Sequence, residues 1–232
     1  MSAGFDLEYI MRVAGVNGRA DLKRHGDILY GSFNGFFHEA LDRTHIKVIP
    51  AKYFRRRSAA VHLMRYAGYA KNLPGEFCEC GVFRGTSAAL IAAAAPHKTI
   101  HLVDSFAGFD APHEKDGEDA GCIKNFDEAT LAHAQLYLKG LDVAFHPGHI
   151  PEILDGLPET AWAFVHIDVD MYEASKACLS YFYPRLCGGG VIVCDDYFTP
   201  WFKGPQAAWD EYCGNEISFV VLDTGQCALI GD

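Results

Sequence analysis

The stretch Glu76-Phe77-Cys78-Glu79-Cys80-Gly81-Val82-Phe83-Arg84-Gly85-Thr86-Ser87-Ala88-Ala89-Leu90 decides the fold. It begins as a short apolar run, passes through two glycines and ends in small helix-forming residues. This order predicts a strand, a tight turn and a helix. Gly81 and Gly85 let the backbone turn sharply and let a ligand approach it closely. The backbone N–H groups of the helix that opens at Thr86 and Ser87 can then hold a polar ligand.

A second predicted strand, Thr99–Val103, follows this helix and ends on Asp104. Asp104 lies 104 − 85 = 19 residues after Gly85. An acidic residue at about this distance binds the ribose hydroxyls in a Rossmann-type unit. A lone Gly-x-x-x-Gly is explained equally well by packing against a neighbouring helix. The two glycines together with Asp104 therefore indicate a nucleoside cofactor.

Strands and helices alternate over the rest of the chain. Further strands are expected at Asp142–His146, Trp162–Asp168, Val191–Cys194, Ser218–Leu222 and Gln226–Ile230. The last two are joined by Asp223-Thr224-Gly225, a tight turn typical of an antiparallel hairpin. The pattern predicts an α/β fold, a doubly wound, mostly parallel seven-stranded Rossmann-like sheet with a closing antiparallel hairpin. A glycine run at Gly188–Gly190 is expected to end the helix before the fifth strand.

Residues 1–74 contain no clear strand, and their apolar residues fall at helical spacing. We expect an N-terminal helical cap over 1–74 and a second domain over 75–232, entered at Pro74-Gly75. The basic cluster Lys52–Arg57 could contact RNA or an anionic substrate, but a solvated helix face is the more common explanation.

Charge and composition narrow the class of protein. The net charge of −10 argues against a nucleic-acid partner. There is no run of about 18 apolar residues that would span a membrane, and the first residues lack a signal pattern. We expect a cytoplasmic protein with no membrane partner. A homo-oligomer remains possible.

Two of the expected strand ends are strongly acidic. Asp168 and Asp170 follow the fourth strand, and Asp195 and Asp196 follow the fifth. Neighbouring strand ends would bring these carboxylates together, and such repulsion requires a cation or protonation. A hard divalent ion, magnesium before calcium, suits oxygen ligands. The alternative is helix capping by Asp170 and Asp196.

Four motifs in order resemble the macrocin O-methyltransferase family: Glu79–Gly85, Val103–Phe109, Ile167–Glu173 and Asp195–Tyr197. The resemblance covers roughly residues 74–213. It implies S-adenosylmethionine as cofactor, usually with Mg²⁺, and methylation of a sugar hydroxyl. It also implies roles for individual residues. Those near the methionine part would be Glu79, Gly81, Gly85 and Thr86. Asp104 would bind the ribose, with Ser105 and Phe106 beside the adenosine. The metal would be held by Asp168, Asp195 and Asp196.

The general base is less defined than the cofactor site. Asp170 matches a possible base of the family or could support the metal, and His149 and His113 are further candidates. His149 stands where the family more often has an aromatic residue. Some relatives place a histidine base late in the chain, but the last histidine here is His166, which lies inside an apolar strand and is expected to be structural.

The acceptor is expected to be a hydroxylated small molecule, first of all a sugar, chosen by the N-terminal cap and a loop at Ala111–Gly121. A metal-dependent methyltransferase of phenols or catechols is an alternative. A nicotinamide-dependent oxidoreductase is a weaker one, because Gly-x-Gly-x-x-Gly is absent and the acidic cluster would be unexplained. A non-catalytic protein that binds S-adenosylmethionine would likewise have no need for so much charge repulsion.

Overall fold

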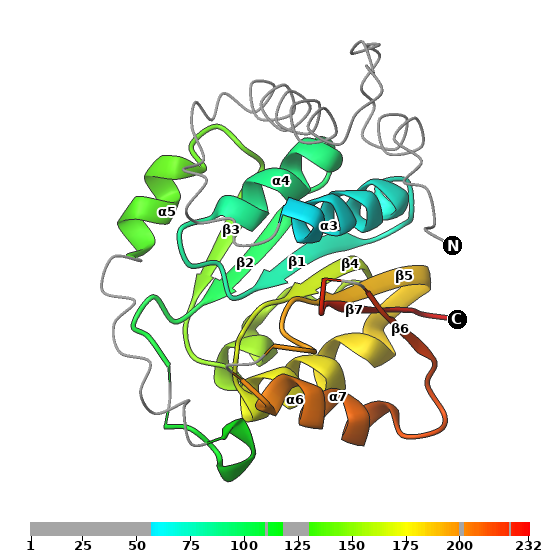
Figure 1. Cartoon of the computed structure of the whole chain (residues 1–232). Coiled ribbons are helices and arrows are strands. Elements are labelled where there is room, and N and C mark those ends of the chain that lie inside the picture. Colours follow the sequence, from blue (N-terminus) through cyan, green and yellow to red (C-terminus); the bar gives the residue numbers. More distant parts are fainter. Residues whose placement is uncertain (1–56, 110, 118–129, 200–201, 223) are drawn as a thin grey trace, which may run out of the picture.

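The structure is a computed structural model that describes residues 57–109, 111–117, 130–199, 202–222 and 224–232. Its seven-stranded sheet has the order β3-β2-β1-β4-β5-β7-β6 (Figure 1). The strands are β1 (Glu76–Cys80), β2 (Ile100–Asp104), β3 (Val143–Pro147), β4 (Trp162–Ile167), β5 (Leu186–Cys194), β6 (Phe219–Val221) and β7 (Cys227–Ile230). Only the pairings with β7 are antiparallel. The predicted doubly wound sheet with a closing hairpin is confirmed.

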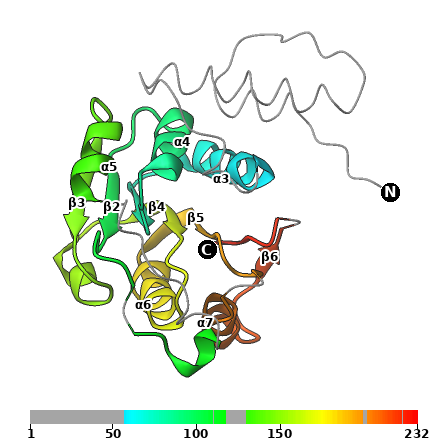
Figure 2. The same cartoon turned by 60° about the vertical axis from the view of Figure 1, so that its left-hand side comes forward.

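Helices cover both faces of the sheet (Figures 1 and 2). One face carries α3 (Arg57–Ala70), α4 (Thr86–Ala94) and α5 (Leu131–Tyr137), and the other carries α6 (Tyr172–Phe182) and α7 (Gly204–Cys213). Among the described residues, short 3-10 helices lie in connections: η2 (Glu114–Asp116), η4 (Glu152–Gly156) and η5 (Tyr183–Arg185). The chain order reverses between β1 and β4, and ligands bind at the carboxyl ends of the strands at such a switch point.

Two apolar cores follow from the alternation of side chains along the strands. The first lies under α3 and α4 and includes Phe77 and Phe164, whose ring centroids are 5.2 Å apart. The second lies under α6 and α7 and includes the fully buried Trp162 and Trp209. A central sheet that is apolar on both faces is typical of parallel strands covered by helices.

One boundary differs from the sequence prediction. The glycines at Gly188–Gly190 do not end a helix but lie within β5, which begins at Leu186. A Cβ at Gly190 would lie 2.8 Å from the carbonyl oxygen of Trp162, so only glycine fits there. The pairing of β4 with β5 shifts register between Trp162 and Phe164 at the same place.

The helices expected within residues 1–56, and residues 52–56 of the basic cluster, lie outside the described residues. The described part of the expected cap is α3, which packs against α4 and β5 and contributes Leu63 and Met64 to the first core. The division into 1–74 and 75–232 stays a prediction. Within the described residues, no helix is both long and apolar enough to cross a membrane.

Candidate active site

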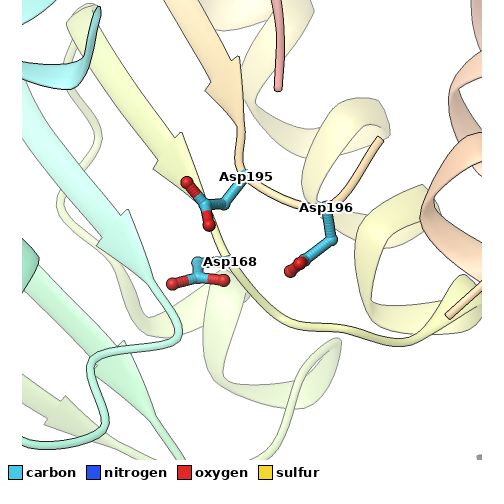
Figure 3. A group of neighbouring side chains, drawn as sticks. All are labelled: Asp168, Asp195 and Asp196. Carbon is cyan, nitrogen blue, oxygen red and sulfur yellow. The ribbon is translucent and has the colours of Figure 1, made fainter. Parts of the chain in front are cut away.

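An acidic cluster lies where β4 and β5 end. Ile167 pairs with Cys194, so Asp168 and Asp195 follow neighbouring strand ends. Carboxylate oxygens of Asp168, Asp195 and Asp196 lie within 4.8 Å of one another. Figure 3 shows the three side chains turned toward a common space. The convergence expected from the sequence is therefore confirmed for these three of the four carboxylates.

The electrostatics of this cluster are unfavourable without a cation. Burial, and then the charges of Asp195 and Asp196, raise the pKa of Asp168 well above its usual range. Burial, and then the charge of Asp195, raise the pKa of Asp196 to about 6. Among the described residues, the buried Oδ2 of Asp196 has no hydrogen-bond partner. Three oxygen donors with one unsatisfied buried oxygen fit a hard divalent ion.

His166 is joined to this cluster, which sequence reasoning did not foresee. Its Nδ1 lies 2.9 Å from Oε1 of Glu79, and its Nε2 lies 3.8 Å from Oδ1 of Asp195. Burial lowers the pKa of His166, but the hydrogen bonds and charges of Asp195 and Glu79 outweigh it and raise that pKa to about 9. A positively charged His166 thus offsets part of the negative charge of the cluster.

A cavity of about 820 Å³ opens beside the acidic cluster. Eleven of the thirteen predicted site residues line it: Gly81, Thr86, Asp104, Ser105, Phe106, His113, His149, Asp168, Asp170, Asp195 and Asp196. Glu79 and Gly85 are not among the lining residues. Glu79 is fully buried beneath the cavity against His166, and a Cβ at Gly85 would meet the side chain of Leu138 at 2.8 Å.

The glycine loop brings the start of α4 to this cavity. Gly85 is the N-cap residue, with a left-handed φ of 85°, and no side chain caps the helix. Thr86 and Ser87 in the first turn line the cavity. Gly81 is required for packing, because a Cβ there would lie 1.8 Å from the carbonyl oxygen of Asp168. The uncapped end of α4 is suited to a negatively charged group.

Asp104 holds this loop in shape. Its Oδ2 accepts hydrogen bonds from the backbone N–H groups of Val82 (2.7 Å) and Phe83 (2.8 Å), and its Oδ1 accepts one from Phe106 (2.7 Å). A carboxylate offers about four acceptor positions. Most of its hydrogen-bonding capacity is therefore used by the protein, which leaves room for about one bond to a ligand.

The opposite wall is built by η2 and the start of α6. Asp116 is buried, and its carboxylate accepts hydrogen bonds from the backbone N–H groups of His113 (2.7 Å) and Tyr172 (2.6 Å). His113 stacks on Tyr172 with centroids 4.7 Å apart. Met171 and Phe202 form a small apolar cluster beside them. The described part of the predicted loop, 111–117, is thus packed against α6 and α7, and 118–121 lie outside the described residues.

Three functional candidates were missed from the sequence: His166, Asp116 and Gln226. His166 and Gln226 line the cavity, and Gln226 donates a hydrogen bond from Nε2 to Oδ1 of Asp195 (2.6 Å). One signal was available for His166, since it lies two positions before Asp168 and therefore on the same side of the strand. No local signal marks the contact of Asp116 with Tyr172 or that of Gln226 with Asp195, because these partners lie 56 and 31 positions apart.

Comparison with known proteins identifies a family for this chain. A model of the family described as Macrocin-O-methyltransferase (TylF) matches residues 55–217. The chain is 32% identical over 143 residues to 8-demethyl-8-(2,3-dimethoxy-alpha-L-rhamnosyl)-tetracenomycin-C 4'-O-methyltransferase from Streptomyces olivaceus, covering 55% of each chain. It is 32% identical over 147 residues to mycinamicin III 3''-O-methyltransferase from Micromonospora griseorubida, covering 55% of this chain and 57% of that one.

A solved structure supports the same fold. The O-methyltransferase NovP superposes with a TM-score of 0.67 at 18% identity, over 87% of this chain and 98% of that one. The chain spans about half the length of the curated relatives it matches. The family model covers well over half of the chain, and the four motifs that it spans build the described cavity. On this basis the chain belongs to the macrocin O-methyltransferase family.

Proposed function

We propose that the protein is an O-methyltransferase that uses S-adenosylmethionine and a divalent cation, Mg²⁺ first, to methylate a hydroxyl of a sugar or glycosylated small molecule. The observation that carries this proposal is the convergence of Asp168, Asp195 and Asp196 beside a cavity that the start of α4 also reaches. Family membership supports the methyltransferase chemistry. The printed names of two relatives support a sugar-linked acceptor.

The cofactor is assigned to the side of the cavity formed by the glycine loop. When bound, S-adenosylmethionine supplies a methyl group already activated by a sulfonium centre. The first turn of α4, at Thr86 and Ser87, would receive its carboxylate, because backbone N–H groups and the helix dipole favour an anion there. Asp104 has about one acceptor position left for a ribose hydroxyl. Ser105 and Phe106 follow it and would contact the adenosine.

The metal is assigned to Asp168, Asp195 and Asp196. Mg²⁺ held there would supply positive charge and Lewis acidity to a nearby hydroxyl. The chain's own contribution is to align the acceptor oxygen with the methyl group, and this positioning supplies most of the rate gain. Asp170 remains the first candidate to accept the hydroxyl proton, since it lines the cavity and its carboxylate lies within hydrogen-bonding reach of Asp196.

The two histidine candidates differ. Nδ1 of His113 accepts the backbone N–H of Lys115 at 3.1 Å. In the neutral ring Nε2 then carries the proton, so His113 can donate a hydrogen bond to an acceptor but has no free lone pair with which to act as a base. His149 is exposed at the edge of the cavity and remains the second candidate for the base.

The test is a methyl-transfer assay with the Asp195→Ala/Asp196→Ala double variant. Turnover should fall to background while the far-ultraviolet circular dichroism stays native, because both side chains lie at strand ends and outside the apolar cores. Wild-type activity should be lost in EDTA and restored by Mg²⁺. Normal turnover of the double variant would refute the metal role. Acceptors should include a sugar glycoside and a catechol, and preference for the catechol would favour the alternative acceptor class.

A further inference from the structure

Four central strands each bring one polar side chain to the same face of the sheet. Glu79 belongs to β1, His166 to β4, Asp195 follows β5 and Gln226 precedes β7. Each lies two positions from a residue of the first apolar core, in strand order Phe77, Phe164, Val193 and Ala228. Side chains two apart share a face, so these four form a row beneath the cavity. Such a row of polar side chains at the end of an apolar core requires a reason beyond packing.

The C-terminal hairpin holds one oxygen of Asp195. Gln226 Nε2 donates to Oδ1 of Asp195 at 2.6 Å. Thr224 Oγ1 in turn donates to Oε1 of Gln226 at 2.9 Å, so the orientation of the amide is determined by both of its ends. Thr224 and Gln226 are only 5% and 1% exposed, and water therefore competes little for these bonds.

His166 is a second neighbour of the same oxygen. Nε2 of His166 lies 3.8 Å from Oδ1 of Asp195, and the ring is oriented by Glu79, 2.9 Å from Nδ1. Oδ1 of Asp195 thus accepts a hydrogen bond from Gln226 and has the imidazole of His166 as a further neighbour. Figure 3 shows the carboxylate of Asp195 turned toward those of Asp168 and Asp196, and oxygens of the three side chains lie within 4.8 Å of one another.

We propose that Gln226 is a positioning residue for Asp195, fixing the orientation of its carboxylate so that the cluster with Asp168 and Asp196 is ready for a hard divalent cation. This inference rests on the proposed function, because it specifies how the cluster is kept ready for its cation. The hairpin β6–β7 then has a role at the site although it contributes no metal ligand. Residues that orient ligands in this way typically affect metal affinity 10–100-fold.

The test measures cation binding to the full chain without cofactor or acceptor. Gln226→Met keeps the length of the side chain and removes its amide, and it should weaken Mn²⁺ binding, followed by electron paramagnetic resonance, roughly 10–100-fold. Gln135→Met, the same change at an exposed position of α5, should leave it unchanged. Thr224→Val, which frees the amide but leaves Gln226 in place, should weaken binding less. Wild-type affinity in a folded Gln226→Met protein would overturn the inference.

A second measurement separates this inference from the proposed function. Thermal midpoints of metal-free Gln226→Met, Asp195→Ala and the double variant should be non-additive, because the two side chains form one contact. Additive midpoints would overturn the positioning role whatever the cation does. A wild-type protein that binds neither Mn²⁺ nor Mg²⁺ yet gives a non-additive cycle would refute the cation in both proposals and leave the coupling of Gln226 to Asp195 supported.

Discussion

At the scale of single residues, the environment of Asp196 favours a positive charge or a proton beside its carboxylate. Its carboxylate lies beside two others, and its pKa is raised to about 6. The folded protein therefore binds a proton at Asp196 more tightly than the unfolded chain does, where the pKa is near 3.8. The stability contributed by this proton is fully present below about pH 4 and is lost as the pH rises through about 6.

Replacing Asp196 by asparagine should remove this pH dependence. In EDTA, the free energy of unfolding of wild type relative to Asp196→Asn should fall between pH 4.5 and 6.5, by on the order of 2–3 kcal/mol. Urea unfolding at several pH values measures this difference, and comparison of the two proteins cancels the titrating groups that do not interact with Asp196. A constant difference over this range would show that Asp196 does not hold the extra proton.

At the scale of elements, the wall opposite the cofactor loop depends on one buried carboxylate that joins η2 to α6. Asp116 accepts the backbone N–H of Tyr172 at the first turn of α6, where intrahelical partners are missing. Tyr172 is tied to α7 through its hydroxyl, which donates to Oε2 of Glu211 at 2.6 Å, and Lys115 of η2 forms an ion pair with Glu211. Three elements thus meet around Tyr172.

Asp116→Ala should weaken the attachment of η2 to the start of α6. It leaves the N–H groups of His113 and Tyr172 without their acceptor, at a cost of about 1–3 kcal/mol each when they stay buried. The midpoint of urea unfolding should fall. KM for the acceptor should rise more than KM for the cofactor, because the affected wall lies opposite the glycine loop to which the cofactor is assigned. Glu114→Ala, an exposed change in the same 3-10 helix, is the control. Equal effects of the two substitutions would contradict the role given to Asp116.

The sequence predicted most elements within a few residues. The sequence predicted strand β1, the helix that begins at Thr86 and the hairpin, because each has a local signal. That signal is either a regular spacing of apolar residues or a turn residue. The sequence did not predict the start of β5, because the glycines at 188–190 resemble the end of a helix. Only the proximity of the Trp162 carbonyl oxygen explains a strand containing glycine at that point.

At the scale of the whole molecule, α3 packs against α4 and against strands β4 and β5 of the sheet. It buries Leu63 and Met64 in the first core, and its residues Ala59, Ala60 and Leu63 also line the cavity. Burial of each large side chain contributes on the order of 1.5–3 kcal/mol. The predicted boundary at residue 74 would divide this core.

A truncation series should detect this dependence. The chain 75–232 should melt at a lower temperature than 57–232, or without a cooperative transition, because it lacks α3 and exposes its contacts with α4 and β5. Circular dichroism during heating measures both. Identical melting of the two proteins would support the boundary at residue 74 instead.

The sequence alone determined the class of fold and the convergence of Asp168, Asp195 and Asp196. The spacing of apolar residues, the turn residues and the order of elements can be read from local stretches of sequence. Parallel strands bring their carboxyl ends to the same edge of the sheet whatever their exact register. Only the tertiary structure decided three contacts. Glu79 is buried against His166 instead of lining the cavity, Asp104 accepts most of its hydrogen bonds from backbone N–H groups of the protein, and Gln226 donates a hydrogen bond to Asp195. Those contacts join residues 87, 21 and 31 positions apart. They depend on strand register and side-chain packing, which no single stretch of the chain contains.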